Sequence, residues 1–204
     1  NYRQWLTQMN YLSVREQAGA EIITKLTGRD AVVLVDPTLM LSKEKWISIS
    51  KSAVNKPKNN YLLTYFLGGI SRENDRIIKS IASEQNLEIV NLASMNDRER
   101  FSTDPSEFID YINSSTIFLT DSFHGCVFSI LFEKPFIVFE RGGKIPSMNS
   151  RIETLLSKFE LESRKWENVK GINNVFKIDY SHVPDILEGE RQKTYNYLKE
   201  ALNI

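Results

Sequence analysis

The chain has 204 residues, of which 41% are hydrophobic and 25% charged, a composition typical of a globular protein and not of a disordered one. Its 26 Lys and Arg residues balance 26 Asp and Glu residues, so it lacks the positive excess on which nucleic-acid and anionic-membrane binding depend. One cysteine excludes an intramolecular disulfide, and no apolar run approaches the roughly 20 residues of a transmembrane helix. The sequence predicts a single Rossmann-like domain over residues 1–204.

Short apolar runs alternate along the chain with longer stretches of helical periodicity. The predicted strands are residues 11–14, 31–35, 61–67, 88–92, 116–120 and 135–140. Residues 31–35 and 136–139 are apolar at every position, which indicates burial on both faces, as in a parallel sheet covered by helices. The alternation predicts an α/β fold, with a doubly wound, mostly parallel sheet of six or seven strands.

The predicted helices have recognisable ends. They cover residues 17–26, the stretch after Gly68-Gly69, the stretch after Asp104, residues 126–132 and about 184–202. Two starts have the spacing of a capping box, Ser13 with Glu16 and Asp104 with Glu107. Cys126 follows Gly125 on an apolar helix, which favours a small buried thiol over a reactive one. Two stretches are predicted to be loop or irregular structure, residues 51–60 and 161–174.

In an open parallel sheet, ligands bind beyond the carboxyl ends of the strands, so the residues that follow each strand are the candidate site. Polar, basic and glycine residues gather at these positions, namely Ser13, Arg15, Asp36, Gly68, Gly69, Ser122, Phe123, His124, Gly125, Arg141 and Lys144. We expect Arg15, Gly69, Ser122, His124, Gly125 and Lys144 to line one cleft at this end of the sheet. The sequence contains no standard dinucleotide fingerprint, no P-loop and no His/Asp/Glu cluster with metal spacing, so no metal is predicted.

The segment 120–125 is the most informative of these. A buried strand ends there and a helix begins, and the free N–H groups and dipole of a helix start favour an anion. His124 can donate a hydrogen bond to phosphate or transfer a proton, and Gly125 would let a ligand approach the backbone closely. The alternative is that Asp121 or Ser122 only caps the helix while His124 packs at its start.

The other candidates also have structural alternatives. Arg15 is a planar donor suited to carboxylate or phosphate, yet the capping box around it needs no function for it. Gly68 and Gly69 fit a flexible turn as well as a ligand contact. Asp36 fits the end of a strand, and Lys144 fits an ordinary solvated charge.

Several motifs, in this order along the chain, resemble those of the polysaccharide pyruvyl transferase family. They are Ser13-Val14-Arg15-Glu16 before a helix, Val35-Asp36-Pro37, Thr120-Asp121-Ser122-Phe123-His124-Gly125, and Lys134-Pro135 followed by Lys144. The resemblance covers about residues 10–160. The family more often has Arg-Leu/Phe-His-Gly at the histidine motif, where this chain has Asp121-Ser122 before Phe123-His124. Members are similar to GT-B glycosyltransferases, with two facing Rossmann-like halves, and this chain would be the C-terminal, donor-binding half.

The resemblance implies transfer of a pyruvyl group from phosphoenolpyruvate to two hydroxyls of a sugar in a cell-surface or extracellular glycan, without a cofactor. His124 and Arg15 would be catalytic, and the substrate-binding residues would be Ser13, Gly68, Gly69, Ser122, Phe123, Gly125 and Lys144. The implied location is the cytoplasm, at most peripheral to the inner face of the membrane. The implied partners are phosphoenolpyruvate, a glycan acceptor and an N-terminal half. Where the N-terminal half is absent, a second copy of the chain could cover the face that it would have covered.

Two other classes of function stay open. A GT-B glycosyltransferase half would bind a nucleotide-sugar donor, with Gly68-Gly69 near the diphosphate, but would also need a ribose or base partner that the sequence does not convincingly offer. A non-catalytic domain would keep the fold for protein contacts, and then neither Arg15 nor His124 would matter to a ligand.

Overall fold

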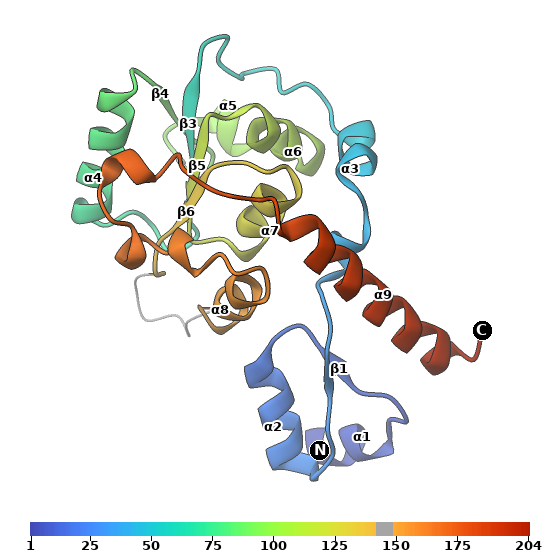
Figure 1. The fold of residues 1–204 in the computed structure, drawn as a ribbon. Helices are drawn as coiled ribbons and strands as arrows, with labels where there is room; N and C mark the ends of the chain where they lie inside the picture. The colour runs from blue at the N-terminus through green and yellow to red at the C-terminus, as the bar shows by residue number, and fades with distance from the viewer. Residues whose placement is uncertain (142–148) are drawn as a thin grey trace.

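Six strands form two separate parallel sheets in the computed structural model of the protein, which describes residues 1–141 and 149–204 (Figure 1). The larger sheet has the order β4-β3-β5-β6, with β3 (Tyr61–Tyr65), β4 (Glu88–Asn91), β5 (Ile117–Thr120) and β6 (Phe136–Val138). The smaller sheet pairs β1 (Ser13–Val14) with β2 (Val32–Val33). The predicted α/β fold with parallel, Rossmann-like pairing is confirmed. The prediction of one sheet of six or seven strands is wrong, because residues 34–60 lead the chain away from β2 before β3 begins.

Helices cover both faces of the larger sheet (Figure 1). Helix α4 (Arg72–Glu84) packs on one face, and α6 (Pro105–Ser114) and α7 (Phe123–Leu131) pack on the other. Successive residues of β5 serve the two cores in turn, because side chains alternate along a strand: Ile117 and Leu119 face α4, and Phe118 faces α7. All three are fully buried, which explains the continuous apolarity of this strand.

The order of the strands creates a switch point between β3 and β5. From β3 the chain crosses over α4 to β4 on one side, and from β4 it crosses back through α5 (Arg98–Phe101) and α6 to β5 on the other side of β3. At such a reversal the two crossovers leave a crevice beyond the carboxyl ends of the central strands, which is where ligands bind in open α/β sheets. The residues after β3 and β5 therefore border the natural binding position of this sheet.

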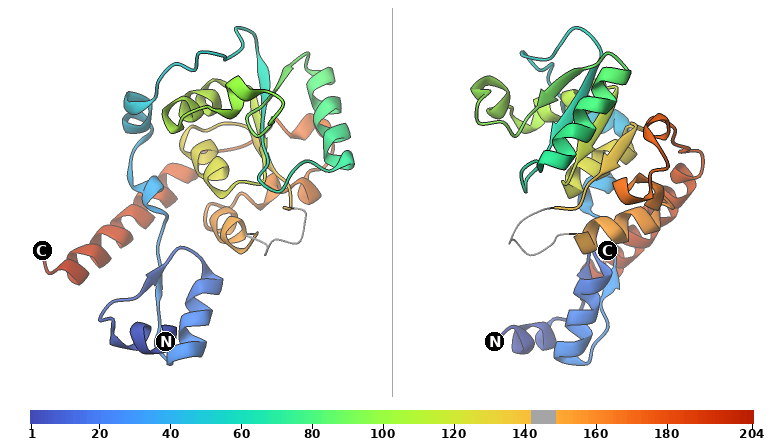
Figure 2. Two further views of the ribbon diagram at one scale, coloured as in Figure 1. Left: turned by 180° about the vertical axis from the view of Figure 1, so that it is seen from behind. Right: turned by 90° about the vertical axis from the view of Figure 1, so that its left-hand side faces the viewer.

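The smaller sheet belongs to a unit at one end of the molecule (Figure 2). This unit contains α1 (Tyr2–Gln8) and α2 (Gln17–Thr27), and the chain leaves it through the short 3-10 helix η1 (Pro37–Met40) and α3 (Lys43–Ile49). After β6 come α8 (Asn149–Lys158), the short turns η2 (Glu162–Arg164), η3 (Trp166–Asn168) and η4 (Ile172–Asn174), and α9 (Val183–Leu202).

The last helix ties the two parts of the molecule together. On α9, Arg191 Nε donates a 2.7 Å hydrogen bond to the Leu39 carbonyl and Lys193 Nζ a 3.0 Å bond to the Val33 carbonyl. The Tyr197 ring packs edge-on against Tyr11, with 6.1 Å between ring centroids. The helix thus leaves the larger sheet and returns to β2 and the segment after it.

One of the two predicted capping boxes is present. At the start of α6, the Asp104 carboxylate accepts from the Glu107 N–H at 2.9 Å, and the Glu107 carboxylate accepts from the Asp104 N–H at 3.3 Å. The box predicted for Ser13 and Glu16 is wrong. Ser13 is paired with Val32 in the β1–β2 ladder, so α2 begins only after Glu16, whose side chain makes no capping bond.

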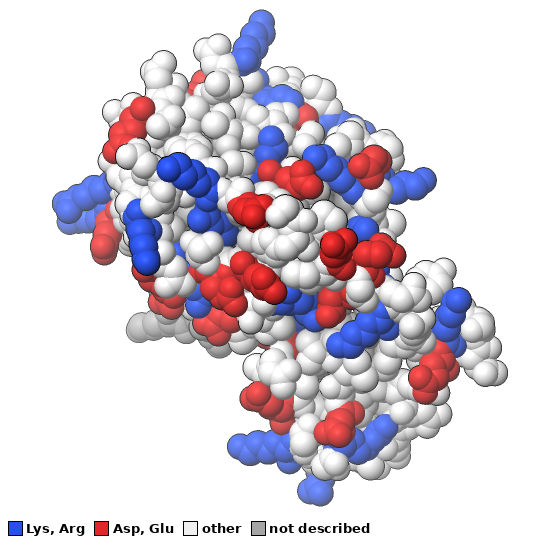
Figure 3. All heavy atoms as spheres, viewed as in Figure 1, with Lys and Arg blue, Asp and Glu red and all other residues white. Residues whose placement is uncertain are grey.

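Charges of both signs are interspersed over the face shown in Figure 3, with no patch of one sign dominating it. This mixture fits the zero net charge of the sequence. Within residues 1–141 and 149–204, no helix combines the length and apolarity needed to cross a bilayer.

Gly125 allows α7 to lie directly against β5. A Cβ added at this position would stand 2.9 Å from Phe118 Cε1 and 3.1 Å from Thr120 Oγ1. Phe118 is fully buried, so its ring has no open space to move into. The structure therefore gives the glycine of the histidine motif a packing role, whereas close approach of a ligand to its backbone stays a prediction.

Gly125→Ala should therefore destabilise the fold by about 1–3 kcal/mol through overpacking. Urea unfolding followed by circular dichroism measures this change. The matched control is Gly189→Ala on α9, where nothing lies within 4 Å of the added Cβ and the higher helix propensity of Ala should stabilise the protein by up to about 1 kcal/mol. Equal effects of the two substitutions would contradict the packing role.

Candidate functional site

Three predicted or motif residues from distant parts of the chain meet at the start of α7. The Asp36 carboxylate oxygen Oδ2 accepts a hydrogen bond from Arg15 Nη1 and lies 3.8 Å from His124 Nε2. The Asp36 side chain is buried, that of Arg15 is 39% exposed and that of His124 is 53% exposed. The structure thus brings Arg15 and His124 to the same place, with one buried carboxylate behind two exposed cationic or ionisable groups. We call these three residues the Asp36 cluster.

Asp36 is held in its ionised form by its surroundings. Burial raises the pKa of its carboxyl, but hydrogen bonds from Thr38 and Arg15 and the nearby charge of His124 outweigh this and lower the pKa below its usual value. The backbone N–H of Thr38 donates to Oδ1 at 2.9 Å, which makes Asp36 the cap of η1. One oxygen of the carboxylate therefore fixes the turn and the other faces Arg15 and His124.

The start of α7 provides a second feature suited to an anion. Ser122 is its N-cap, and the Ser122 hydroxyl accepts the Gly125 N–H at 3.3 Å. Ser122 thus caps the helix, as expected for one of Asp121 and Ser122. The N–H groups of the first residues of a helix have no partner within the helix, so those of Phe123 and His124 point beyond its start. The start of α7 adjoins the Asp36 cluster, because His124 belongs to the cluster and the Arg15 guanidinium stands 5.9 Å from the centroid of the Phe123 ring.

A second buried carboxylate, that of Asp121, connects the loops that border the site. It accepts the backbone N–H groups of Leu67 at 2.7 Å and Gly68 at 2.8 Å, both in the turn after β3. Arg141, just after β6, donates to the same carboxylate from Nε at 3.3 Å and to the Asp121 carbonyl from Nη2 at 3.0 Å. Asp121 therefore holds the ends of β3, β5 and β6 in fixed positions relative to one another.

The glutamate of the Ser13-to-Glu16 motif also has a structural partner. Its carboxylate accepts a hydrogen bond from the Ser150 hydroxyl at 2.6 Å and from Arg151 Nε at 3.2 Å, both on α8. Glu16 thus joins the first turn of α2 to the start of α8. Arg15, its neighbour in sequence, is held between this contact and Asp36.

Of the remaining predicted residues, Ser13 and Gly69 lie in described parts of the chain. Ser13 is an exposed residue of β1. Gly69 has a φ of +78°, a left-handed conformation that favours glycine and explains this residue in the turn. Lys144 lies outside the described residues. Binding of a substrate by Ser13, Gly68, Gly69, Ser122, Phe123, Gly125 and Lys144 stays a prediction.

Cys126 takes no part in the site. Its thiol is fully buried in α7, and burial and the nearby Asp121 raise its pKa. The predicted small buried thiol is confirmed. Among the described residues, no group of three or more His, Cys, Asp and Glu side chains could hold a metal ion.

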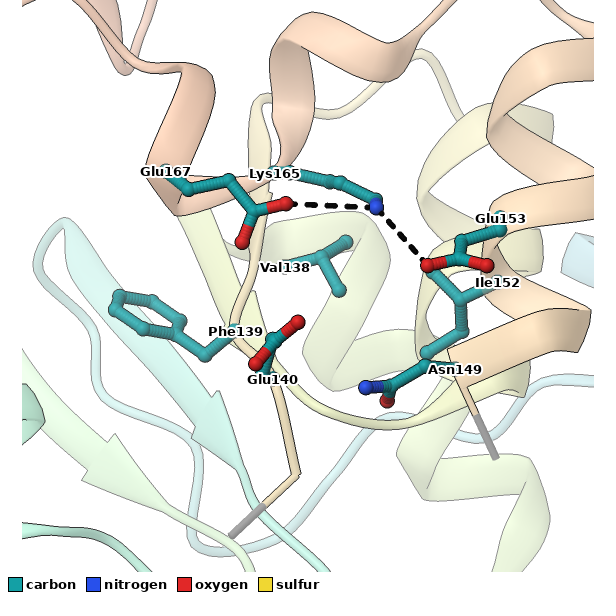
Figure 4. Close-up of a pocket in the computed structure, with 8 residues that line it drawn as sticks. All are labelled: Val138, Phe139, Glu140, Asn149, Ile152, Glu153, Lys165 and Glu167. Atoms are coloured by element: carbon teal, nitrogen blue, oxygen red, sulfur yellow. Dashed lines mark hydrogen bonds and ion pairs between the residues drawn. The ribbon is translucent and has the colours of Figure 1, made fainter. Parts of the chain in front are cut away.

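A separate pocket lies at the end of β6 (Figure 4). It is lined by Val138, Phe139, Glu140, Asn149, Ile152, Glu153, Lys165 and Glu167. Lys165 Nζ lies 3.2 Å from a Glu153 oxygen and 3.5 Å from a Glu167 oxygen, so its charge is already compensated. With three carboxylates against one ammonium, this pocket would repel an anionic ligand. The Asp36 cluster and the start of α7 are the better anion site.

Sequence reasoning gave neither Asp36 nor Asp121 a catalytic or substrate-binding role. Asp36 was noted after a predicted strand and in a motif, but this pattern is the same for an aspartate that only ends a strand. Asp121 was noted in the histidine motif and as a possible helix cap. The available signal was the position of both aspartates after buried strands. Their partners are far away in sequence: Arg15 is 21 residues from Asp36, and Arg141 and Leu67 are 20 and 54 residues from Asp121.

Comparison with protein families gives a match over most of the chain. The family model described as polysaccharide pyruvyl transferase matches residues 1–143 of the 204 residues. No curated protein and no solved structure matches the chain. The matched range contains the whole Asp36 cluster and Asp121.

Asp36→Asn should lower the free energy of unfolding at pH 7 by about 1–3 kcal/mol, because a charged hydrogen bond to Arg15 is lost. The folded-state pKa of Asp36 is lowered, so its stabilisation is present above the unfolded value near 4 and lost as pH falls through the folded value. The gap between wild type and variant should therefore shrink below about pH 4.

Urea unfolding at pH 7 and pH 3 measures this gap. The control is Asp75→Asn, which removes an exposed ion pair with Lys79 on α4 worth roughly 0.3–0.5 kcal/mol at most. A gap for Asp36→Asn that is the same at both pH values would show that the charge of Asp36 does not stabilise the fold.

Proposed function

The chain belongs to the polysaccharide pyruvyl transferase family, and we propose that it transfers a pyruvyl group from phosphoenolpyruvate to a sugar of a cell-surface or extracellular glycan. The product would be a ketal, and inorganic phosphate would be released. The observation that carries this proposal is the Asp36 cluster beside the start of α7.

Phosphoenolpyruvate carries two anionic groups, a carboxylate and a phosphate. An arginine guanidinium binds such groups through two parallel N–H donors, and the N–H groups at a helix start bind a second anion. The contact between Arg15 and Asp36 uses Nη1, and the guanidinium has five N–H donors in all. We propose that Arg15 and the start of α7 hold the two ends of the donor.

The reaction requires two proton movements. The methylene carbon of phosphoenolpyruvate gains a proton, and its central carbon forms bonds to the two sugar oxygens as the bond to the phosphate oxygen breaks. The two sugar hydroxyls together lose two protons, of which one balances the new methyl group and the other the departing phosphate. His124 is the exposed titratable group of the cluster, and we propose that it carries one of these protons.

Asp36 acts in this proposal as a positioning residue. Its carboxylate lies 3.8 Å from His124 Nε2 and is bonded to Arg15. A buried carboxylate beside an imidazole fixes the orientation of the ring and stabilises the cation formed when the ring takes a proton. Donors fixed before the reaction stabilise the charge on the departing phosphate without reorganisation, so no metal is needed for this step.

We also propose that the chain works as the donor-binding half of a GT-B-like enzyme in the cytoplasm, at most peripheral to the membrane. Large apolar side chains remain exposed on the unit with β1 and β2. Tyr2, Trp5 and Ile22 are each more than half exposed. An acceptor-binding half or a second copy covering these groups would bury this surface. Analytical ultracentrifugation of the chain distinguishes a monomer from a dimer.

His124→Gln should lower the rate of phosphate release roughly 10²–10⁴-fold, because glutamine keeps a hydrogen-bonding group but transfers no proton. The assay is phosphate release from phosphoenolpyruvate with a glycan acceptor, on the intact enzyme. The control is His182→Gln, because His182 Nε2 contacts the Phe159 carbonyl at 2.9 Å, away from the cluster. Near-wild-type rates for His124→Gln would return His124 to a structural role.

Arg15→Lys should weaken phosphoenolpyruvate binding about tenfold or more, since an ammonium cannot provide the planar pair of donors. Calorimetric titration with phosphoenolpyruvate measures the effect. The control is Arg29→Lys, because Arg29 donates to backbone carbonyls within the first unit, including that of Leu6 at 2.9 Å. Tight binding of uridine diphosphate with no binding of phosphoenolpyruvate would favour a glycosyltransferase instead.

A further inference from the structure

A groove runs beyond the carboxyl ends of β3, β4 and β5, and Arg15 is not among its lining residues. Its volume is about 330 Å³, which falls within the range of small-molecule sites, about 300–1,000 Å³. The lining residues are Tyr65, Leu67, Leu92, Phe101, Thr103, Pro105, Phe108, Ser122 and His124. The groove therefore occupies the switch point between β3 and β5, and it shares His124 with the Asp36 cluster.

The groove differs from the Asp36 cluster in its chemistry. None of its described lining residues is a Lys, Arg, Asp or Glu, and His124 stands alone among them as a group that can be cationic near neutral pH. Its lining residues are mainly aromatic or aliphatic, and Tyr65, Thr103 and Ser122 are the hydroxyl-bearing residues among them. Away from the helix start at Ser122 and His124, such a wall suits a neutral ring with an apolar face and hydroxyls at its edge.

The aromatic wall is held in place by packing and by a cation. The Tyr65 ring packs edge-on against Phe108, with 5.1 Å between centroids. Helix α5, which ends at Phe101, is anchored by Arg100, whose Nε donates to the Asn55 carbonyl at 3.2 Å and whose Nη2 lies 3.3 Å from Glu88. The wall is thus fixed before any ligand arrives.

Two side chains at the groove are more exposed than apolar residues that only serve packing. Phe101 is 54% exposed and Leu67 is 52% exposed, although both lie beside other apolar groups. A half-exposed ring in a groove that also contains His124 offers a flat apolar face to a ligand.

We propose that this groove binds the neutral sugar of the acceptor, with the ring against Phe101 and the reacting hydroxyls toward His124. This assignment rests on the proposed function, because only a reaction at His124 requires the acceptor here. It gives this half of the enzyme a direct part in acceptor binding. A nucleobase could also stack on Phe101, but a nucleotide's diphosphate would then meet an uncharged wall.

The test uses saturation-transfer NMR on the intact enzyme, with a panel of methyl glycosides of glucose, galactose, mannose and N-acetylglucosamine as probes. Phe101→Ala should weaken binding of the preferred glycoside roughly two- to tenfold, the range expected for loss of one aromatic face. Phe101→Leu keeps an apolar side chain but removes the aromatic face, so it should weaken glycoside binding nearly as much as Phe101→Ala. Phe101 is largely exposed, so both variants should fold, which circular dichroism checks.

The matched control is Tyr195→Ala on α9, an aromatic residue that is 55% exposed and lies away from the groove. It should leave glycoside binding unchanged. Phosphoenolpyruvate titrations on the same samples separate the two proposals, since neither Phe101 variant should alter donor binding. Glycoside binding that is indifferent to Phe101 would overturn the groove assignment while donor binding still stands. If the wild-type enzyme does not bind phosphoenolpyruvate, the proposed function itself is overturned.

A last arm uses uridine diphosphate as the probe. Binding of this nucleotide that depends on Phe101, without binding of any glycoside, would assign the groove to a nucleotide and overturn the acceptor assignment.

Discussion

A single buried carboxylate, that of Asp36, holds the candidate site together. Its Oδ1 fixes the turn of η1 through Thr38, and its Oδ2 faces both Arg15 and His124. Burial of an unpaired carboxylate is costly, so Asp36 keeps its place only while these partners are present. The same contacts that stabilise the charge of Asp36 therefore fix the two groups suited to anion binding and proton transfer. The geometry of the site and the stability of the η1 turn therefore both depend on the charged carboxylate of Asp36.

Asp121 plays a similar part for the backbone. Its carboxylate joins the turn after β3 to Arg141 after β6, and it does so next to the N-cap of α7. The site thus stands on two buried acids, one that holds side chains and one that holds loops. Gly125 adds a steric condition, since it sets how closely α7 approaches β5. Together these contacts explain why polar residues gather at the carboxyl ends of otherwise apolar strands.

Much of this could be predicted from local sequence. Continuous apolarity identified buried strands such as β5, the pattern at Asp104 identified a helix start, and the rule that ligands bind beyond strand ends placed Arg15 and His124 at one end of the sheet. The division into two sheets could not be predicted, because it depends on where residues 34–60 lead. The capping box at Ser13 failed for a related reason: backbone pairing with Val32 and the contact of Glu16 with α8 compete with a cap. Long-range partners of this kind leave no trace in local spacing.

The separation of the two sheets has a consequence for how the protein matures. The larger sheet and its helices bury their own cores, so they can form while the unit with β1 and β2 is still undocked. Arg15 meets Asp36 where the β1–β2 pairing continues, because the Leu34 N–H bonds to the Val14 carbonyl next to it. Asp36 reaches His124 on α7 only when this unit has docked, and closing contacts between distant segments is slow compared with forming local ones. A chain with nearly complete helix and strand content can therefore lack the contact between Asp36 and His124, and secondary-structure content does not measure whether the Asp36 cluster has assembled.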